Sequence, residues 1–377
     1  MNILFFVSSM HAGGAERVAA TLTGAWRRAG HRVTLVPTYT QKGVLFYELD
    51  EGVHLRWLAD EVGSLKRTPL APLAKLWALR RLVRRERPDV IVSFLTNVNV
   101  MVLMATRGMG VPVIVCERTH PALSTSATPI LQRLRRRLYP HADMVTVQAE
   151  ASLDAMSNLV PGIRQLAVVP NPLPSSLPAA RERPPTSEVV APPQRYRLVA
   201  MGRLVESKRF GDLIRLFGRL APRFPDWDLV IWGEGPLRAD LEAMIAAGDL
   251  KERILLPGRT AEPWSELLAA DLFVLTSEVE GFPNALLEAM ALGLPCVAVD
   301  CPSGPKEITR SGEDAVLVPL NDMAALEQAL AGLMADPGER ARLGAQGAHS
   351  VRARYGIDQV LKHWDSLFHA VRSGSRH

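Results

Sequence analysis

Two glutamates in the C-terminal half are spaced so that both could serve one ligand. Glu280 follows an apolar run in a predicted loop, and Glu288 lies eight residues later on an otherwise apolar predicted helix. A carboxylate on an apolar helix is seldom buried without a partner. Pro283 suits the first turn of that helix, whose N-terminus presents N–H groups to an anion. These N–H groups are those of Phe282, Asn284 and Ala285. Carboxylates beside an anion site fit a sugar nucleotide, which combines hydroxyl groups with a diphosphate.

Cations precede this region in the sequence. Arg203 and Lys208 follow the first apolar run of the C-terminal half. A guanidinium and an ammonium at the carboxyl end of a strand suit a diphosphate, although a pair of exposed cations at a helix start is the alternative. Near the N-terminus, Gly13 and Gly14 could let a ligand approach the backbone or could form a tight turn without a ligand. The dinucleotide fingerprint G-x-G-x-x-G is absent here, which argues against a nicotinamide enzyme.

Apolar β-branched runs alternate with helical stretches in both halves, which predicts two α/β domains with parallel sheets covered on both faces. The strands expected in the first half are 2–8, 31–37, 89–94, 112–117, 144–149 and 166–170, and those in the second are 196–202, 228–233, 253–258, 271–277, 295–300 and 315–320. Residues 38–75 are irregular. We therefore predict a doubly wound domain over 1–172, a Pro-rich linker over 173–194, a second such domain over 195–355, and a final helical segment over 356–377.

Three cysteines without C-x-x-C spacing, Cys116, Cys296 and Cys301, indicate reduced and mostly buried thiols. The histidines lack ligand spacing, and Asp226-Trp-Asp228 reads as a turn and cap before a strand, so we expect no metal site. The apolar N-terminal run is too short for a signal peptide or a membrane span. We expect a cytoplasmic protein.

The positive charge is concentrated in the first half of the chain. Residues 1–190 have a net charge of +9, and residues 191–377 have −4. The excess comes largely from two clusters, Arg80/Arg81/Arg84/Arg85/Arg87 and Arg133/Arg135/Arg136/Arg137. No nucleic-acid motif accompanies them. Either they form a solvated helix face, or they bring the first domain to an anionic membrane as a peripheral protein, on the inner face of the plasma membrane.

The spacing E-x7-E from Glu280 to Glu288, the surrounding G-x-P-N-A-L-x-E-A-M and the upstream GRL-x-x-x-K (202–208) together resemble the family-4 retaining glycosyltransferases of the GT-B fold. The similarity extends to bacterial members that extend polyprenyl-diphosphate-linked oligosaccharides. The segments GGAER (13–17), SFLTNVN (93–99), CERTHP (116–121), PNP (170–172) and CPSGP (301–305) fit the same group, so the resemblance spans nearly the whole chain. It implies two Rossmann-like domains that face a cleft.

The resemblance also implies roles for individual residues. Arg203 and Lys208 would hold the donor diphosphate, Glu288 the ribose and Glu280 the transferred sugar, while Gly14 would line the opposite side. Many family members have Glu-His where this chain has Glu117-Arg118, and the nearest histidine here is His120. Either His120 reaches the sugar or Arg118 stabilises the departing phosphate. Front-face transfer with the donor phosphate as base, which the resemblance implies, tolerates loss of that histidine.

We therefore expect a metal-independent hexosyltransferase that uses no cofactor. It would move a hexose or N-acetylhexosamine, with retention, from a nucleotide sugar (UDP-linked preferred) to a lipid-linked or glycan acceptor in polysaccharide or glycoconjugate synthesis. Two alternatives remain at this point. One is a nucleotide-sugar epimerase of the same fold, and the other is a non-catalytic nucleotide-sugar-binding partner, suggested by the missing Glu-His.

Overall fold

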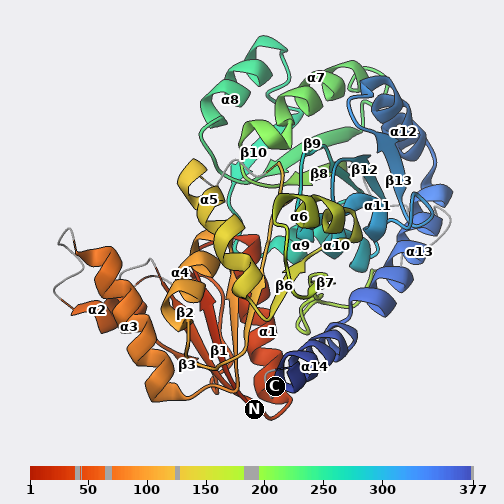
Figure 1. Ribbon diagram of the computed structural model, residues 1–377. Coiled ribbons are helices and arrows are strands. Elements are labelled where there is room, and N and C mark those ends of the chain that lie inside the picture. The colour runs from red at the N-terminus through yellow and green to blue at the C-terminus, as the bar shows by residue number, and fades with distance from the viewer. Residues whose placement is uncertain (39–42, 44, 64–69, 124–127, 182–194, 375–377) are drawn as a thin grey trace. The chain divides into compact units, whose positions relative to one another are not determined.

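The computed structural model describes residues 1–38, 43, 45–63, 70–123, 128–181 and 195–374. The chain divides into two compact units (Figure 1). Unit 1 comprises Met1–Ser175 together with Tyr355–His377, and unit 2 comprises Ser176–Arg354. Residues 182–194 of the predicted linker lie outside the described residues.

Unit 1 is built on a parallel sheet in the order β3-β2-β1-β4-β5-β6-β7. Its strands are β1 (Asn2–Val7), β2 (Arg32–Pro37), β3 (His54–Leu55), β4 (Val90–Phe94), β5 (Val113–Cys116), β6 (Met144–Val147) and β7 (Leu166–Val168). Strand β1 pairs with β2 on one side and with β4 on the other. Every residue of β4 and β5 is buried, as expected for a parallel sheet covered on both faces.

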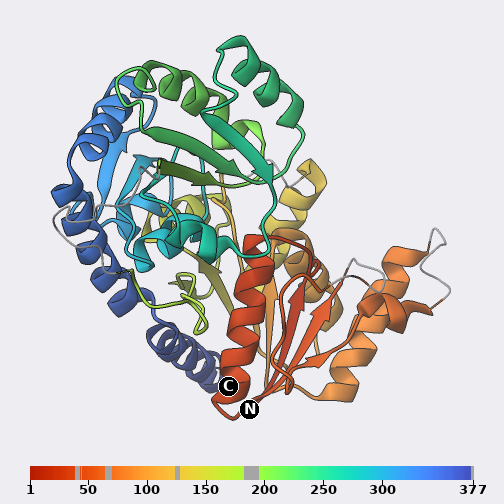
Figure 2. The same cartoon turned by 180° about the vertical axis from the view of Figure 1, so that it is seen from behind.

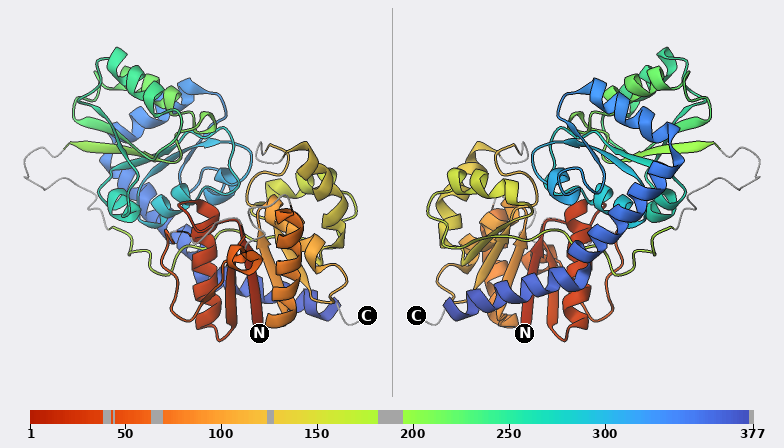
Figure 3. Two further views of the ribbon diagram at one scale, coloured as in Figure 1. Left: turned by 90° about the vertical axis from the view of Figure 1, so that its left-hand side faces the viewer. Right: turned by 90° about the vertical axis from the view of Figure 1, so that its right-hand side faces the viewer.

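Helices cover both faces of this sheet. They are α1 (Gly14–Arg28), α2 (Leu58–Val62), α3 (Ala71–Glu86), α4 (Thr96–Thr106), α5 (Pro129–Leu138), α6 (Leu153–Leu159) and α14 (Ile357–Gly374), with short 3-10 turns η2 (Tyr139–His141) and η3 (Glu150–Ser152). Helices α2 to α6 contribute to one core cluster, and α1 and α14 contribute to another. The views in Figures 2 and 3 show α14 running beside α1. There the ring of Trp26 packs against Trp364 and Phe368, with centroids 5.2 Å and 5.4 Å apart.

Unit 2 has a parallel sheet in the order β10-β9-β8-β11-β12-β13. Its strands are β8 (Tyr196–Met201), β9 (Trp227–Trp232), β10 (Ile254–Gly258), β11 (Leu272–Leu275), β12 (Cys296–Asp300) and β13 (Val316–Pro319). This is the Rossmann strand order, and its direction reverses between β8 and β11. The helices are η4 (Glu206–Lys208), α7 (Phe210–Leu220), α8 (Arg238–Ala247), α9 (Pro263–Leu268), α10 (Asn284–Ala291), α11 (Pro305–Ile308), α12 (Met323–Ala335) and α13 (Pro337–Tyr355).

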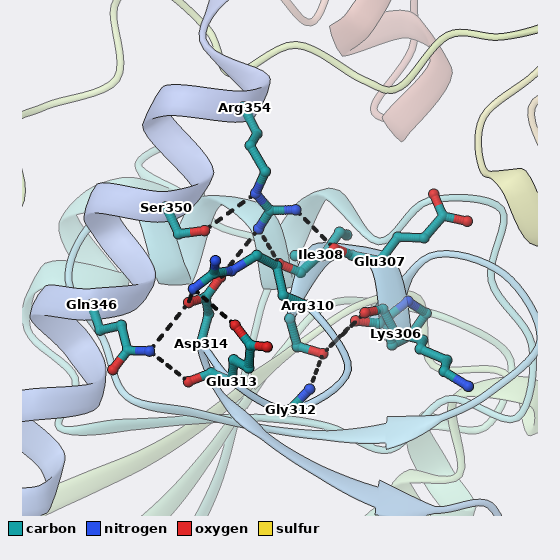
Figure 4. A network of polar contacts seen from close by, with 12 residues as sticks. Lys306, Glu307, Ile308, Arg310, Gly312, Glu313, Asp314, Gln346, Ser350 and Arg354 are labelled. Carbon is teal, nitrogen blue, oxygen red and sulfur yellow. Dashed lines mark hydrogen bonds and ion pairs between the residues drawn. The ribbon is translucent and has the colours of Figure 1, made fainter.

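A polar network joins α13 to α11 and to the segment that follows it (Figure 4). Arg354 donates to the carbonyls of Glu307 and Ile308 at 2.8 Å and 2.6 Å. It also pairs with the fully buried carboxylate of Asp314 at 3.3 Å, to which Arg310 donates at 2.7 Å. Burial alone would raise the pKa of Asp314, but the hydrogen bonds from Arg310 and Ser350 and the charges of Arg310 and Arg354 outweigh it, so the pKa lies below its usual range.

The predicted fold class is confirmed, and each strand expected from the sequence is present. Strand β3 and helix α2 were not predicted, because they lie in the irregular region 38–75. All three cysteines are buried free thiols. Among the described residues, none of the helices combines the length and the apolar character that a membrane span requires.

Candidate functional site

The site in unit 2 forms where the strand order reverses. Strands β8 and β11 are neighbours in the parallel sheet, so the loops that follow them leave the same edge. The first loop carries Lys208 in η4, and the second carries Glu280. The Lys208 ammonium forms an ion pair with Glu280 Oε1, and Ser277 Oγ donates to the same oxygen at 2.6 Å. Two residues that the sequence suggested for one ligand are thus in direct contact.

Further hydrogen bonds hold the two loops together. The Glu278 N–H donates to the Ser207 carbonyl at 2.8 Å. Thr276 Oγ1 donates to the Lys208 carbonyl at 2.7 Å. The Lys208–Glu280 pair therefore rests on a fixed backbone, as an electrostatic site requires.

Arg203 is exposed in the loop after β8, whose backbone packs tightly against the end of β9. Gly202 N–H donates to the Trp232 carbonyl, and Leu204 N–H to the Glu234 carbonyl, both at 3.0 Å. Gly233 has φ +145°, and a Cβ there would lie 1.8 Å from the Gly202 carbonyl oxygen. Only glycine permits this approach.

Glu288 lies on α10 and is 3% exposed. Its Oε2 accepts a hydrogen bond of 2.8 Å from the indole Nε1 of Trp264, which lies on the neighbouring helix α9. Burial of the charged carboxylate is thus matched by an indole donor. The role of Trp264 could not be predicted from the sequence, because the pairing depends on where α9 packs against α10.

Helix α10 begins at Asn284, with Pro283 as its N-cap, one residue later than predicted. Phe282 therefore precedes the helix, and only Asn284 and Ala285 of the three suggested residues lie in its first turn. The loop 301–305 supports this start, since Ser303 Oγ donates to the Gly281 carbonyl at 2.8 Å. Gly304 has φ +101°, and a Cβ there would lie 2.6 Å from Pro283 Cδ.

In unit 1, the segment after β5 carries Arg118, which is 9% exposed. Its guanidinium lies 4.1 Å from the centre of the Phe94 ring and donates to Asn171 of the PNP segment. Burial lowers the pKa of Arg118 to about 10, so the side chain remains a cation at neutral pH. Within the described residues, Arg118 forms no ion pair, and its Nε has no hydrogen-bond partner.

His120 is 8% exposed, and burial lowers its pKa. The imidazole is therefore neutral at pH 7. Its Nδ1 is buried and has no hydrogen-bond partner in the part of the chain that the structure describes. The two alternatives from the sequence are thus a buried cation and a buried neutral imidazole two residues apart.

Gly14 is the first residue of α1, directly after the Gly13 N-cap. The Gly13 backbone is extended (φ −172°), and its N–H donates to Tyr47 Oη at 3.2 Å.

One residue of the predicted basic clusters does not belong to an exposed face. Arg135 is 2% exposed and lies among apolar side chains of α5, whereas Arg133, Arg136 and Arg137 of the same helix are exposed or partly so. Arg85 pairs with Glu61 at 2.8 Å, which neutralises part of the other cluster. Asp228 pairs with Arg195 and Arg253. No group of three or more His, Cys, Asp or Glu side chains that could hold a metal ion occurs among the described residues.

Comparison with known proteins gives a family for each half. Residues 13–172 match the model of the glycosyl transferase 4-like domain, and residues 186–350 match that of glycosyl transferases group 1. An exopolysaccharide phosphotransferase of Streptomyces coelicolor is 28% identical, over 98% of this chain and 40% of that protein. The chain thus spans less than half of that relative's length.

Other relatives match from end to end. A Campylobacter jejuni α-1,4-N-acetyl-D-galactosaminyltransferase, whose name gives a diNAcBac-PP-undecaprenol-linked glycan as acceptor, is 25% identical over 99% of each chain. The structure of S. aureus TarM, solved with fondaparinux, alpha-GlcNAc-glycerol and UDP, superposes with a TM-score of 0.82 at 12% identity, over 97% of this chain and 99% of that one. Two family models that together match most of the chain, on two parallel-sheet α/β units, show that this protein belongs to the glycosyltransferases of the GT-B fold.

Proposed function

We propose that this chain transfers a hexose or N-acetylhexosamine from a nucleotide sugar, with UDP preferred, to a lipid-linked or glycan acceptor, with retention of the anomeric configuration. The observation that carries the proposal is the joining of Lys208 and Glu280 at the point where the sheet of unit 2 reverses its strand order. Ligands of such sheets bind at this point. UDP is bound in the solved TarM structure, and a lipid-linked acceptor appears in the name of the Campylobacter relative.

In the proposed donor complex, Arg203 and Lys208 bind the diphosphate. Bound phosphate would compete with Glu280 for the Lys208 ammonium and leave the Glu280 carboxylate to accept from hydroxyls of the transferred sugar. Glu288 accepts from the ribose, and the first N–H groups of α10, at Asn284 and Ala285, favour the negative charge. Cationic side chains would here supply the charge stabilisation of the leaving diphosphate, and we propose that no metal ion or other cofactor is required.

Arg118 and His120 supply the assistance from unit 1. A buried cation without an anionic partner is costly, and a phosphate would repay that cost. We assign Arg118 to the departing phosphate and the neutral His120 to a hydrogen bond with the transferred sugar. Replacing His120 by Ala should then lower kcat more for the natural donor than for one that lacks the contacted hydroxyl.

We propose that unit 1, as the acceptor domain, contacts an anionic membrane through exposed side chains of α3 and α5. The side chains of Leu73, Trp77 and Ile130 are 66%, 61% and 73% exposed, which is unusual for such large apolar groups. Arg81 lies 5.5 Å from the centre of the Trp77 ring. Exposed apolar and cationic groups suit the boundary of anionic lipid, where each cation contributes about 1 kcal/mol. Such a surface would hold the protein at the inner face of the plasma membrane.

Vesicle sedimentation tests this surface separately from catalysis. Trp77→Ala should reduce binding to phosphatidylglycerol-containing vesicles, while its turnover of a water-soluble acceptor analogue stays unchanged. Equal sedimentation of Trp77→Ala and wild type would refute the membrane surface.

The donor proposal is tested with Glu280→Gln and Lys208→Met. Both variants should lose transfer to an undecaprenyl-diphosphate-linked acceptor by about a hundredfold or more, as expected when charged groups at a reacting centre are removed. The matched control is Arg215→Met, an exposed arginine on α7 of the same unit. The anomeric proton coupling of the product reports retention or inversion. Full activity of both variants would refute the assignment, and isomerised donor in the absence of acceptor would indicate an epimerase.

A further inference from the structure

Of the segments 93–99 and 116–121, the proposed function uses only Arg118 and His120. In the structure, buried polar side chains join the two segments. Ser93 Oγ donates to Asn99 Oδ1 at 2.7 Å. Asn99 Nδ2 lies 3.0 Å from the Cys116 carbonyl and 2.9 Å from Tyr139 Oη. Because Ser93 and Asn99 are fully buried, these bonds are protected from water.

The chain of hydrogen bonds leads to Glu117, which is 2% exposed. The hydroxyl of Thr96 lies 3.0 Å and 2.8 Å from its two carboxylate oxygens, and Tyr139 Oη donates to Oε1. Burial and the neighbouring Glu117 charge raise the pKa of Tyr139 well above its ordinary value. The phenol therefore stays protonated and can serve as a donor to the carboxylate.

Arg135 contacts both ends of the segment that carries Arg118 and His120. Its Nη1 lies 3.8 Å from Glu117 Oε1, and its Nη2 donates to the Pro121 carbonyl at 3.2 Å. Arg135 is itself 2% exposed. One guanidinium thus spans residues 117 to 121, and the planar fork of arginine allows it to bind two acceptors at once.

Of the two buried arginines in this region, only Arg135 pairs with a carboxylate among the described residues. Arg135 compensates the buried carboxylate of Glu117, as a buried anion requires. Arg118, the adjacent residue, forms no ion pair among the described residues. The Glu117–Arg135 pair therefore fixes the loop, and the positive charge of Arg118 is not neutralised by it.

We infer that Arg135 is a positioning residue. It holds residues 117–121 as a short rigid loop and so fixes Arg118 and His120 in one arrangement. This inference rests on the proposed function only for the part that concerns catalysis. Misplacement of a reacting group by about 1 Å can cost about a hundredfold in rate, so a residue that touches no substrate can control turnover.

The test compares Arg135→Met, Arg135→Lys and the double variant Arg135→Met/Glu117→Gln. The double variant removes both charges of the pair, so neither partner is left as an uncompensated buried ion, and it tests the positioning role even where Arg135→Met folds poorly. Exposed Arg164→Met in the same unit is the matched control. We expect kcat to fall by about tenfold to a hundredfold in both Met variants. The fall in kcat should exceed any rise in the donor KM or in the Kd of UDP, because Lys208 and Glu288 of unit 2 still hold the donor, whereas Arg118 acts on the charge that develops on the departing phosphate. Arg135→Lys recovers part of kcat, since it keeps the charge but not the fork.

A second measurement does not depend on activity. Diethyl pyrocarbonate modification of His120, followed by peptide mass spectrometry, reports whether the loop stays closed around that side chain. Exposed His363 serves as the internal reference. Modification of His120 should be slow in wild type and several-fold faster in the Met variants. Unchanged reactivity of His120 would overturn the inference that Arg135 holds residues 117–121. Faster modification with unchanged kcat would overturn the role of Arg135 in turnover. A wild-type protein without transfer would refute the proposed function. The reactivity of His120 would still show whether Arg135 holds residues 117–121.

Discussion

Trp264→Phe isolates one hydrogen bond of the proposed ribose site. The substitution keeps an aromatic ring on α9 and removes the indole N–H that lies 2.8 Å from Glu288 Oε2. A hydrogen bond to a charged group contributes about 1.5–3 kcal/mol to folding stability. In a unit of this size, its loss corresponds to a decrease in Tm of about 3–12 °C. The Glu288 side chain then loses the hydrogen bond from Trp264.

The binding measurement compares two proteins and two ligands in a double-mutant-type cycle. UDP and 2′,3′-dideoxy-UDP are titrated calorimetrically into wild type and Trp264→Phe. We expect the variant to bind UDP about tenfold more weakly, which is about 1.4 kcal/mol and near the lower value of the lost bond. Both proteins should bind the dideoxy ligand equally, because it has no ribose hydroxyls for Glu288.

Either of two results would refute a role for Trp264 in ribose binding. An equal loss of affinity for UDP and for the dideoxy ligand would mean that Trp264 acts on the base or the phosphates. Unchanged UDP affinity together with the expected decrease in Tm would mean that the bond to Glu288 is only structural. Ser265→Ala, which changes an exposed neighbour on the same helix, controls for general effects on α9.

Three further predictions concern stability. Asp314→Asn should destabilise the protein by about 1–3 kcal/mol at pH 7. The wild-type carboxylate has a lowered pKa, so its contribution is present above its unfolded pKa near 4 and is lost as the pH falls through the folded value. The free energies of unfolding of wild type and Asp314→Asn, measured in urea, should thus converge in acid. A difference that stays constant with pH would contradict this. Gly233→Ala should abolish folding of unit 2 or lower its Tm strongly, because its Cβ would meet the Gly202 carbonyl oxygen; a wild-type Tm would show that the loop yields. Trp364→Ala should cost about 3–5 kcal/mol in unit 1, since this fully buried ring packs on Trp26, and a smaller loss in chemical denaturation would indicate that α14 repacks.

The strands were predictable because burial on both faces of a parallel sheet produces continuous apolar runs such as 3–7 and 272–275. The sequence suggested Lys208 and Glu280 for one ligand but did not predict their ion pair, which depends on β8 and β11 being neighbours in the sheet. Strand β3 has two residues, of which His54 is exposed, so no apolar run announced it.

The burial of Arg135 was not predicted, because the four arginines of this helix were treated as one basic cluster. Arg135 lies on the same stripe as Leu131, Leu134 and Leu138, at spacings of four, one and three residues. This stripe faces the core, and the spacing was visible in the sequence. The Trp264–Glu288 bond was not visible, since no local pattern predicts how two helices 24 residues apart in the chain meet.

Helix α14 has a consequence for the order in which the molecule is made. Its Trp364 and Phe368 complete the core around Trp26, yet they follow the whole of unit 2 in the chain. At ribosomal rates of about 5–20 residues per second, the α1 face of unit 1 waits about 10–40 s before its last aromatic side chains exist. During that interval an apolar surface is uncovered on the nascent chain. Chaperone demand during synthesis should therefore be set by the last helix, although it belongs to the unit that emerges first.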